Sequence, residues 1–212
     1  MAIRLTENDL DFMLALARNG FLTVQQIQSR WFNKSYVYCM RRLKQLRDEK
    51  YLAKPIFLER YGSGIHYLTN YGLSFVNDYF GYEYKNYSKS NKIKHFISCG
   101  EFYLNFPYPL QEYKMEFNLK TFMPDIYLKY YHNKEINLLV EIDNTGKTNS
   151  IKQKVTNYTN YLESKAWESD FNGKFPKCLI VSKGNFNIKN FNSRIPFVMI
   201  NFKQLDELKF LL

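Results

Sequence analysis

Residues 124–143 read PDIYLKYYHNKEINLLVEID, and this stretch is the most informative about the fold of the second half of the chain. Two runs rich in aliphatic and aromatic residues flank the loop 132–134, so the stretch predicts antiparallel strands at 125–131 and 136–143. Around them the sequence predicts a helix at 95–106, a strand at 112–119, a helix at 150–164, strands at 177–182 and 197–201, and a closing helix from about Lys203. This order of elements predicts an α/β domain with a mixed sheet.

The two central strands bring acidic side chains together. If Tyr131 faces Glu135 across the loop, counting outward along both strands places Asp125 opposite Glu141. Asp143 falls on the same face, because side chains alternate along a strand. Carboxylates this close repel one another unless a cation or a proton neutralises them, which favours a divalent metal. Mg²⁺ or Mn²⁺ held there with a substrate phosphate would support cleavage of a nucleic acid.

The first eighty residues predict three helices followed by a β-hairpin. Thr6, Thr23 and Ser35 are each placed to cap a helix. The hairpin is predicted from the runs 51–58 and 65–68, which flank a turn that contains glycine. Three helices and a hairpin in this order are typical of a winged helix, in which the third helix enters the major groove of DNA.

The third predicted helix, at about 36–49, has two faces. We expect the residues of one face to be buried, namely Tyr36, Val37, Met40, Leu43 and Leu46. The other face and the hairpin tip carry the predicted DNA contacts, which are Tyr38, Arg41, Arg42, Lys44, Gln45 and Arg60. Between Arg30 and Arg60, nine basic residues stand against three acidic ones, which favours double-stranded DNA as the partner. The alternative is a solvated charged face on a winged helix that binds protein.

Residues 81–94 read as a linker between a domain at 1–80 and a domain at 95–212. The linker carries four lysines interleaved with Tyr84 and Tyr87, and such a segment can follow the backbone of single-stranded DNA. A solvated tether has the same composition.

Composition narrows the class of protein. Hydrophobic residues make up 45% of the 212 residues and charged residues 24%, which predicts a folded chain, and the formal charge of +10 favours a polyanionic partner. The longest apolar runs are too short to cross a membrane, and the first residues do not resemble a secretory signal, so we expect a cytoplasmic protein.

The sequence lacks the residue patterns of several other kinds of functional site. The cysteines are too far apart in sequence for a metal knuckle, so we expect reduced core residues at Cys39, Cys99 and Cys178. The three histidines, His66, His95 and His132, are far apart in the sequence. A relaxase that coordinates its metal with a histidine cluster is therefore not expected. No glycine-rich phosphate loop with its following Lys-Ser/Thr occurs, which argues against an NTPase.

Short motifs in a fixed order carry a resemblance to a known family. Pro124-Asp125 at the start of one strand and Val140-Glu141-Ile142-Asp143 at the end of the next resemble the PD-(D/E)XK nuclease core. Together with a preceding winged helix, Leu68-Thr69-x-x-Gly72 and Lys154-x-x-x-Tyr158, they make nearly the whole chain similar to the replication-relaxation family. The resemblance implies a restriction-endonuclease-like second domain. It also implies a role in replication, DNA relaxation or mobilisation of a plasmid or conjugative element.

One position departs from the nuclease motif. The usual lysine stands two residues after the second acid, where this chain has Asp143. We expect Lys154, or less readily Lys152, to supply the ammonium from the following helix; the alternative is an inactive site. Asp143 is then a third metal ligand or a surface acid, and Glu101 either closes the site or lies on the surface. Tyr158 and Tyr161, on the same helix side as Lys154, are packing residues or DNA contacts.

Two functions follow from these predictions. In the first, the winged helix finds the DNA and the second domain nicks or relaxes it with Mg²⁺ or Mn²⁺, using Asp125, Glu141, Asp143, Lys154 and Glu101. In the second, the protein binds DNA without cleaving it, as a transcriptional regulator or as an accessory factor beside relaxation-complex or replication proteins.

Overall fold

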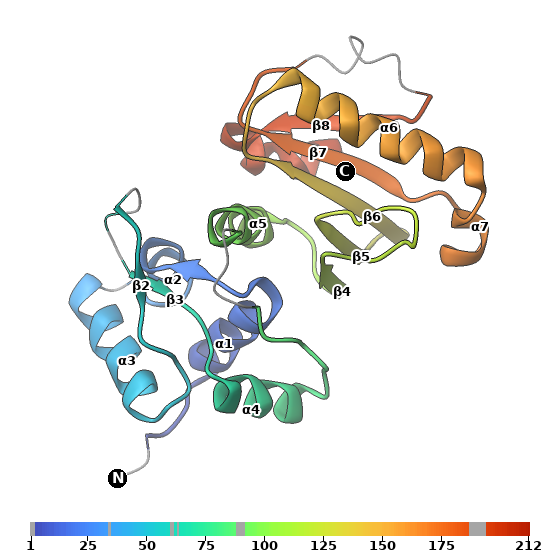
Figure 1. The fold of residues 1–212 in the computed structure, drawn as a ribbon. Coiled ribbons are helices and arrows are strands. Elements are labelled where there is room, and N and C mark those ends of the chain that lie inside the picture. The colour runs from blue at the N-terminus through green and yellow to red at the C-terminus, as the bar shows by residue number, and fades with distance from the viewer. Residues whose placement is uncertain (1–2, 34, 60–61, 63, 88–91, 187–193) are drawn as a thin grey trace. The chain divides into compact units, whose positions relative to one another are not determined.

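The computed structural model describes residues 3–33, 35–59, 62, 64–87, 92–186 and 194–212. The chain divides into two compact units, Met1–Leu104 and Asn105–Leu212 (Figure 1). This division falls about ten residues after the predicted linker 81–94, so most of the helix predicted at 95–106 belongs to the N-terminal unit.

The N-terminal unit is mainly helical. Its elements in chain order are α1 (Glu7–Asn19), β1 (Leu22–Thr23), α2 (Val24–Trp31), α3 (Tyr36–Asp48), β2 (Ile56–Phe57), β3 (Gly64–His66), α4 (Asn70–Phe80) and α5 (Ile93–Asn105). As predicted, side chains of Thr6, Thr23 and Ser35 accept hydrogen bonds from the first turns of α1, α2 and α3. The strands form an antiparallel sheet in the order β1-β3-β2. Three helices are followed by the hairpin of β2 and β3, as predicted, and β1 adds a third strand.

The hairpin returns to the helices through the segment Leu68-Thr69-x-x-Gly72. Leu68 pairs with Leu52 in an isolated β-bridge, and Thr69 caps α4 by accepting a hydrogen bond of 2.9 Å from the Gly72 amide. A Cβ at Gly72 would lie 2.1 Å from the Tyr51 carbonyl oxygen, so only glycine allows this approach. The motif therefore joins the hairpin to α4.

Residues 82–87 pack on the N-terminal unit rather than forming a free tether. The Asn77 side chain exchanges two hydrogen bonds with the backbone of Tyr84, and the guanidinium of Arg18 donates to the hydroxyls of Tyr84 and Tyr103. These contacts hold both the predicted linker and α5 against α1. They are the physical reason why the division falls after α5.

The C-terminal unit contains a mixed sheet. Its elements are β4 (Leu110–Met115), β5 (Ile126–His132), β6 (Lys134–Asp143), α6 (Thr148–Ser164), α7 (Trp167–Asp170), β7 (Lys177–Ser182), β8 (Phe197–Asn201), the 3-10 helix η3 (Phe202–Glu207) and α8 (Leu208–Leu211). The strand order is β4-β5-β6-β7-β8, antiparallel from β4 to β6 and parallel from β6 to β8. The predicted mixed α/β fold is confirmed. The first strand ends at Met115 instead of residue 119, because Glu116 has a left-handed φ of 49°.

The central hairpin has the predicted register, with Tyr131 paired to Glu135. Asn133 makes the turn with a φ of 59°. The long helix α6 lies along one face of the sheet (Figure 1), where Val155 and Tyr158 pack in a buried cluster with Leu139 of β6. Glu141 is two residues from Leu139, so its side chain points to the face that α6 covers. None of the described helices is long and apolar enough to pass through a lipid bilayer.

Candidate functional site

Three predicted residues of the C-terminal unit meet between the sheet and α6. The Lys154 ammonium donates a hydrogen bond of 3.1 Å to Asp125 Oδ2 and forms a second, shorter one with Glu141 Oε2. Asp125 Oδ2 also accepts from the backbone amide of Ile142 at 2.7 Å, which fixes the carboxylate beside β6. The lysine on α6 therefore joins the two acids of the central hairpin. We call Asp125, Glu141 and Lys154 the carboxylate–lysine cluster.

Charge in this cluster is unbalanced. The Glu141 side chain is only 6% exposed, and burial raises its pKa to about 8, with Asp125 adding to the increase and Lys154 opposing it. Burial would lower the pKa of Lys154, but the two carboxylates outweigh it and raise the pKa. Lys154 is therefore charged at neutral pH. One ammonium faces two carboxylates, so the pair of acids retains a proton part of the time or attracts a further cation.

Tyr158 lies one helical turn after Lys154 and faces the same cluster. Its hydroxyl is fully buried beside Glu141, and burial together with Glu141 raises its pKa well above the usual value. Tyr161 is also buried and donates a hydrogen bond of 2.6 Å to Asp170. Both tyrosines are packing residues of the α6 face, whereas Lys152 is exposed.

Asp143 belongs to a different network. Its carboxylate accepts hydrogen bonds from the hydroxyls of Ser182, Thr145 and Ser150 at 2.7, 2.7 and 3.0 Å, and from the amides of Thr145 and Gly146. Burial would raise the pKa of Asp143, but these hydrogen bonds lower it. Lys154 thus contacts two of the three predicted acids, whereas the carboxylate of Asp143 accepts hydrogen bonds from the β6–α6 loop, α6 and β7.

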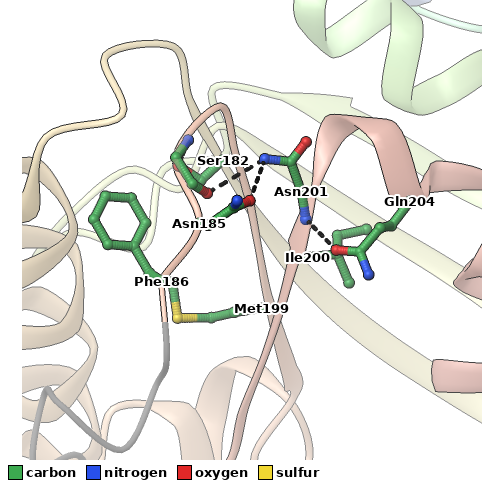
Figure 2. A pocket seen from close by; sticks show the side chains of 8 residues that line it. Ser182, Asn185, Phe186, Met199, Ile200, Asn201 and Gln204 are labelled. Carbon is green, nitrogen blue, oxygen red and sulfur yellow. Dashed lines mark hydrogen bonds between the residues drawn. The ribbon is translucent and has the colours of Figure 1, made fainter.

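A cavity of about 400 Å³ lies at the carboxyl ends of β7 and β8 (Figure 2). Phe186 and Met199 line one part of it, and Ser182, Asn185 and Asn201 line another. The Asn201 amide donates to Asn185 Oδ1 at 3.0 Å and to backbone oxygens of the loop after β7. These polar groups mainly hold that loop on β8.

The residues of the cluster suit a divalent cation that is shared with a substrate. In the described part of the chain, no group of three or more His, Cys, Asp or Glu side chains is arranged to hold a metal. Mg²⁺, however, often takes only one or two protein carboxylates and completes its shell with water and substrate phosphates. Asp125 and Glu141 meet that requirement. Glu101 belongs to the N-terminal unit, where it accepts a hydrogen bond of 2.9 Å from Gln26.

In the N-terminal unit, Arg42 has a structural contact. Its guanidinium donates to both carboxylate oxygens of Asp9 on α1, at 2.9 and 2.6 Å, and also to Gln45 at 2.9 Å. Asp9 is completely buried, and the hydrogen bonds from Arg42 and from Thr6 outweigh the effect of burial and lower its pKa. Arg42 therefore fixes α3 against α1, and Gln45 is engaged by the same guanidinium, which makes both poor candidates for reading bases.

The exposed face of α3 differs from the predicted one. Cys39, Leu43 and Leu46 are buried, whereas the predicted core residues Tyr36, Val37 and Met40 are 53%, 76% and 37% exposed. Burial was predicted correctly for Leu43, Leu46 and Cys39, and wrongly for Tyr36, Val37 and Met40. Arg41 and Lys44 are exposed as predicted, and Arg41 lies over the ring of Tyr38 at 5.5 Å. Arg60 lies outside the described residues.

Sequence reasoning missed the partners of two acids. Asp9 stands three residues after Thr6, so a capping box pointed to its backbone contact but not to Arg42. Ser150 and Thr145 follow Asp143 closely in the sequence, whereas Ser182 reaches it only because β6 and β7 pair in parallel. The three cysteines are buried, as predicted, and no disulfide joins them.

The fold and the cluster define a two-unit α/β protein, with a helical N-terminal unit and a mixed-sheet unit that holds a carboxylate–lysine cluster. The chain belongs to the replication-relaxation family, whose sequence profile matches residues 13–178. The family points to a role in the replication or relaxation of mobile elements. Searches among curated proteins and solved structures find no match.

Proposed function

We propose that this protein binds duplex DNA through its N-terminal unit and nicks one strand at the carboxylate–lysine cluster, for the replication or mobilisation of a plasmid or conjugative element. The observation that carries the proposal is the meeting of Lys154 with both Asp125 and Glu141. Two acids and a lysine on adjacent elements match the residue types of a PD-(D/E)XK site.

DNA binding is supported by the arrangement of α3. The buried pair of Arg42 and Asp9 holds the helix, and Arg41 and Lys44 remain exposed on it. Neutralising phosphates releases counterions, so the logarithm of the affinity should fall linearly with the logarithm of the salt concentration, by about 0.9 per phosphate contacted. Titrating a labelled duplex at several salt concentrations measures this slope. An affinity that does not change with salt concentration would contradict the proposal that the N-terminal unit binds DNA.

Asp125 and Glu141 would hold Mg²⁺ or Mn²⁺. The ion would supply a water nucleophile at neutral pH and would neutralise charge on the phosphoryl oxygens. The hydrogen bond from the Ile142 amide keeps Asp125 oriented toward Glu141. Glu141, whose pKa is raised by burial, must lose its proton before it can ligate a cation, so ion binding is expected to strengthen as pH rises through about 8.

Lys154 would turn from the carboxylates to the phosphate. An ammonium at this position can neutralise a phosphoryl oxygen once the cation has taken over the charge of the two acids. The role resembles that of the motif lysine, supplied here from α6 instead of the strand position that Asp143 occupies.

Nicking of supercoiled plasmid tests the catalytic part of the proposal. We expect a nicked product with Mg²⁺ or Mn²⁺ that disappears with EDTA, in Glu141→Gln and in Asp125→Asn. Glu163→Gln is the matched control, because Glu163 is an exposed acid on α6, the helix that carries Lys154, and pairs with exposed Arg194. Cleavage by Glu141→Gln at the wild-type rate would show that the site is elsewhere.

A non-catalytic DNA-binding role is the second candidate, and one observation favours it. Lys154 already contacts both acids within the fold, so the cluster is able to serve as a buried ion-paired group with a structural role. In that case, wild type and Glu141→Gln both leave the plasmid supercoiled with either metal. Their affinities for duplex DNA would be equal.

A further inference from the structure

The exposed face of α3 contains apolar side chains where a solvated helix would carry polar ones. Val37 is 76% exposed, the largest value among the apolar residues of this helix, and Met40 is 37% exposed. Arg41 and Lys44 follow at helical spacing, so Val37, Met40, Arg41 and Lys44 share one side of α3. We call these four residues the α3 surface.

The packing of the opposite side of α3 prevents the helix from rotating to bury the α3 surface. Cys39, Leu43 and Leu46 are each at most 1% exposed, and they occupy the opposite side of the helix. The bidentate contact between Arg42 and buried Asp9 fixes the rotation of the helix about its axis. The apolar groups are therefore held in solvent by the packing of the whole unit.

We infer that the α3 surface recognises thymine methyl groups in the major groove of duplex DNA, with Val37 and Met40 as the specificity-determining residues. The inference rests on the proposed DNA-binding function and adds the base that is read. In helix-turn-helix proteins the N-terminal residues of the recognition helix contact base edges, and Val37 and Met40 lie in the first half of α3. Thymine is the natural base that presents a methyl group there, and apolar side chains contact it.

Charge selects DNA over an apolar protein partner as the occupant. Arg41 and Lys44 lie on the same side as Val37 and Met40, and an apolar partner would bury these two cations without a counter-charge. A duplex places thymine methyls in the groove and phosphates on both sides of it, so one ligand satisfies the apolar and the basic residues together. The cation–π contact of Arg41 with Tyr38 holds the guanidinium on the exposed part of α3.

Replacing thymine by uracil tests the inference, because it removes only the methyl group. A binding site is first selected from a random duplex library with the full-length protein, and is then synthesised with dT or with dU. We expect the affinity of the wild-type protein to fall about fourfold for each thymine methyl group that is removed from the α3 surface, the worth of one buried methyl-sized group. Fluorescence anisotropy at fixed salt gives the ratio of the two affinities.

Variants of the surface identify the residues responsible. In Val37→Ala and Met40→Ala the dT/dU affinity ratio should fall toward one, while Tyr79→Ala, an exposed residue of α4, should keep the wild-type ratio. Any effect of uracil on the DNA itself is common to all variants and cancels between them. Val37→Thr retains one methyl group and the side-chain shape, so it should keep part of the ratio if contact with the base matters.

The outcomes separate this inference from the function on which it rests. Salt-dependent binding with equal affinity for dT and dU duplexes would overturn the inference and leave DNA binding intact. A ratio above one that survives both alanine variants would assign methyl recognition to other residues and would also overturn it. Failure to bind any duplex would reject the proposed function itself.

Discussion

Lys154 and Glu141 form a buried ion pair that joins the middle of α6 to the end of β6. The lysine also contacts Asp125, so a single side chain links the acids of both strands of the central hairpin. Since each unit carries one tryptophan, Trp31 in the N-terminal and Trp167 in the C-terminal unit, the stability of each can be followed separately. Trp31→Phe leaves a fluorescence probe of the C-terminal unit, and Trp167→Phe leaves one of the N-terminal unit.

We expect the C-terminal unit to lose stability as pH rises from about 5 to about 8. Burial raises the pKa of Glu141 from 4.5 to about 8, so the folded state holds a proton in this range that the unfolded state has released. The free energy of unfolding should fall by roughly 1 kcal/mol per pH unit. Urea titrations of Trp31→Phe in EDTA measure it. Adding Glu141→Gln should flatten the slope, and an unchanged slope would assign the effect to another group.

The N-terminal unit should respond to pH in the opposite direction. His66 is 2% exposed with neither ring nitrogen hydrogen-bonded to a described residue, and burial, aided by Arg47, lowers its pKa from 6.5 to about 4. The unfolded state therefore binds the extra proton, and stability is lost as pH falls from about 6.5 to about 4. Denaturation of Trp167→Phe across this range measures the loss. His66→Leu should remove it; a variant as acid-sensitive as the parent would contradict the prediction.

Asp143→Asn should destabilise the C-terminal unit by about 1–3 kcal/mol, because the carboxylate accepts hydrogen bonds from Ser182, Ser150 and Thr145. An amide cannot accept from all of these donors, since one of its two terminal atoms is itself a donor. Urea denaturation followed by Trp167 fluorescence gives the difference. Glu163→Gln is the control and should change stability by only a few tenths of a kcal/mol. If Asp143→Asn and Glu163→Gln lowered the free energy of unfolding equally, the stabilising role of Asp143 would be contradicted.

Arg42→Met should cost the N-terminal unit about 3 kcal/mol, because it leaves the buried carboxylate of Asp9 without its partner. The double variant Asp9→Leu/Arg42→Met should recover part of this loss, since no unpaired charge remains buried. Arg41→Met removes an exposed charge on the same helix and should leave stability nearly unchanged. Chemical denaturation followed by Trp31 fluorescence compares the three. Equal losses for Arg41→Met and Arg42→Met would be inconsistent with a special role of the Asp9 pair.

Local sequence rules predicted the elements of the C-terminal unit well. The strands 177–182 and 197–201 were predicted with their observed limits, because each is a short apolar run ended by polar residues. The register of the central hairpin followed from its loop, since Tyr131 opposite Glu135 determines every later pair. Helix caps were equally local: Thr6, Thr23 and Ser35 each act on residues of the same turn.

Helix phase and long-range partners required the tertiary structure. Periodicity in α3 is ambiguous because apolar residues occur on both of its sides, and the core selected Cys39 over Val37 and Met40. If Tyr36, Val37 and Met40 were buried as predicted, the α3 surface would not be exposed. The predicted linker also joined the N-terminal unit, through contacts of Asn77 and Arg18 that no local rule contains.

Local sequence patterns predicted the order of the main helices and strands, without β1 and α7, together with the hairpin register and the residue types of the cluster, because these depend on alternation, capping and turn geometry within short segments. Tertiary structure decided which acids contact the Lys154 ammonium. Lys154 reaches Asp125 and Glu141 because α6 packs over that face of the sheet, and Asp143 accepts a hydrogen bond from Ser182 because β7 pairs in parallel with β6. Such partners are separated in sequence and meet only when the core packs, so spacing along the chain does not encode them.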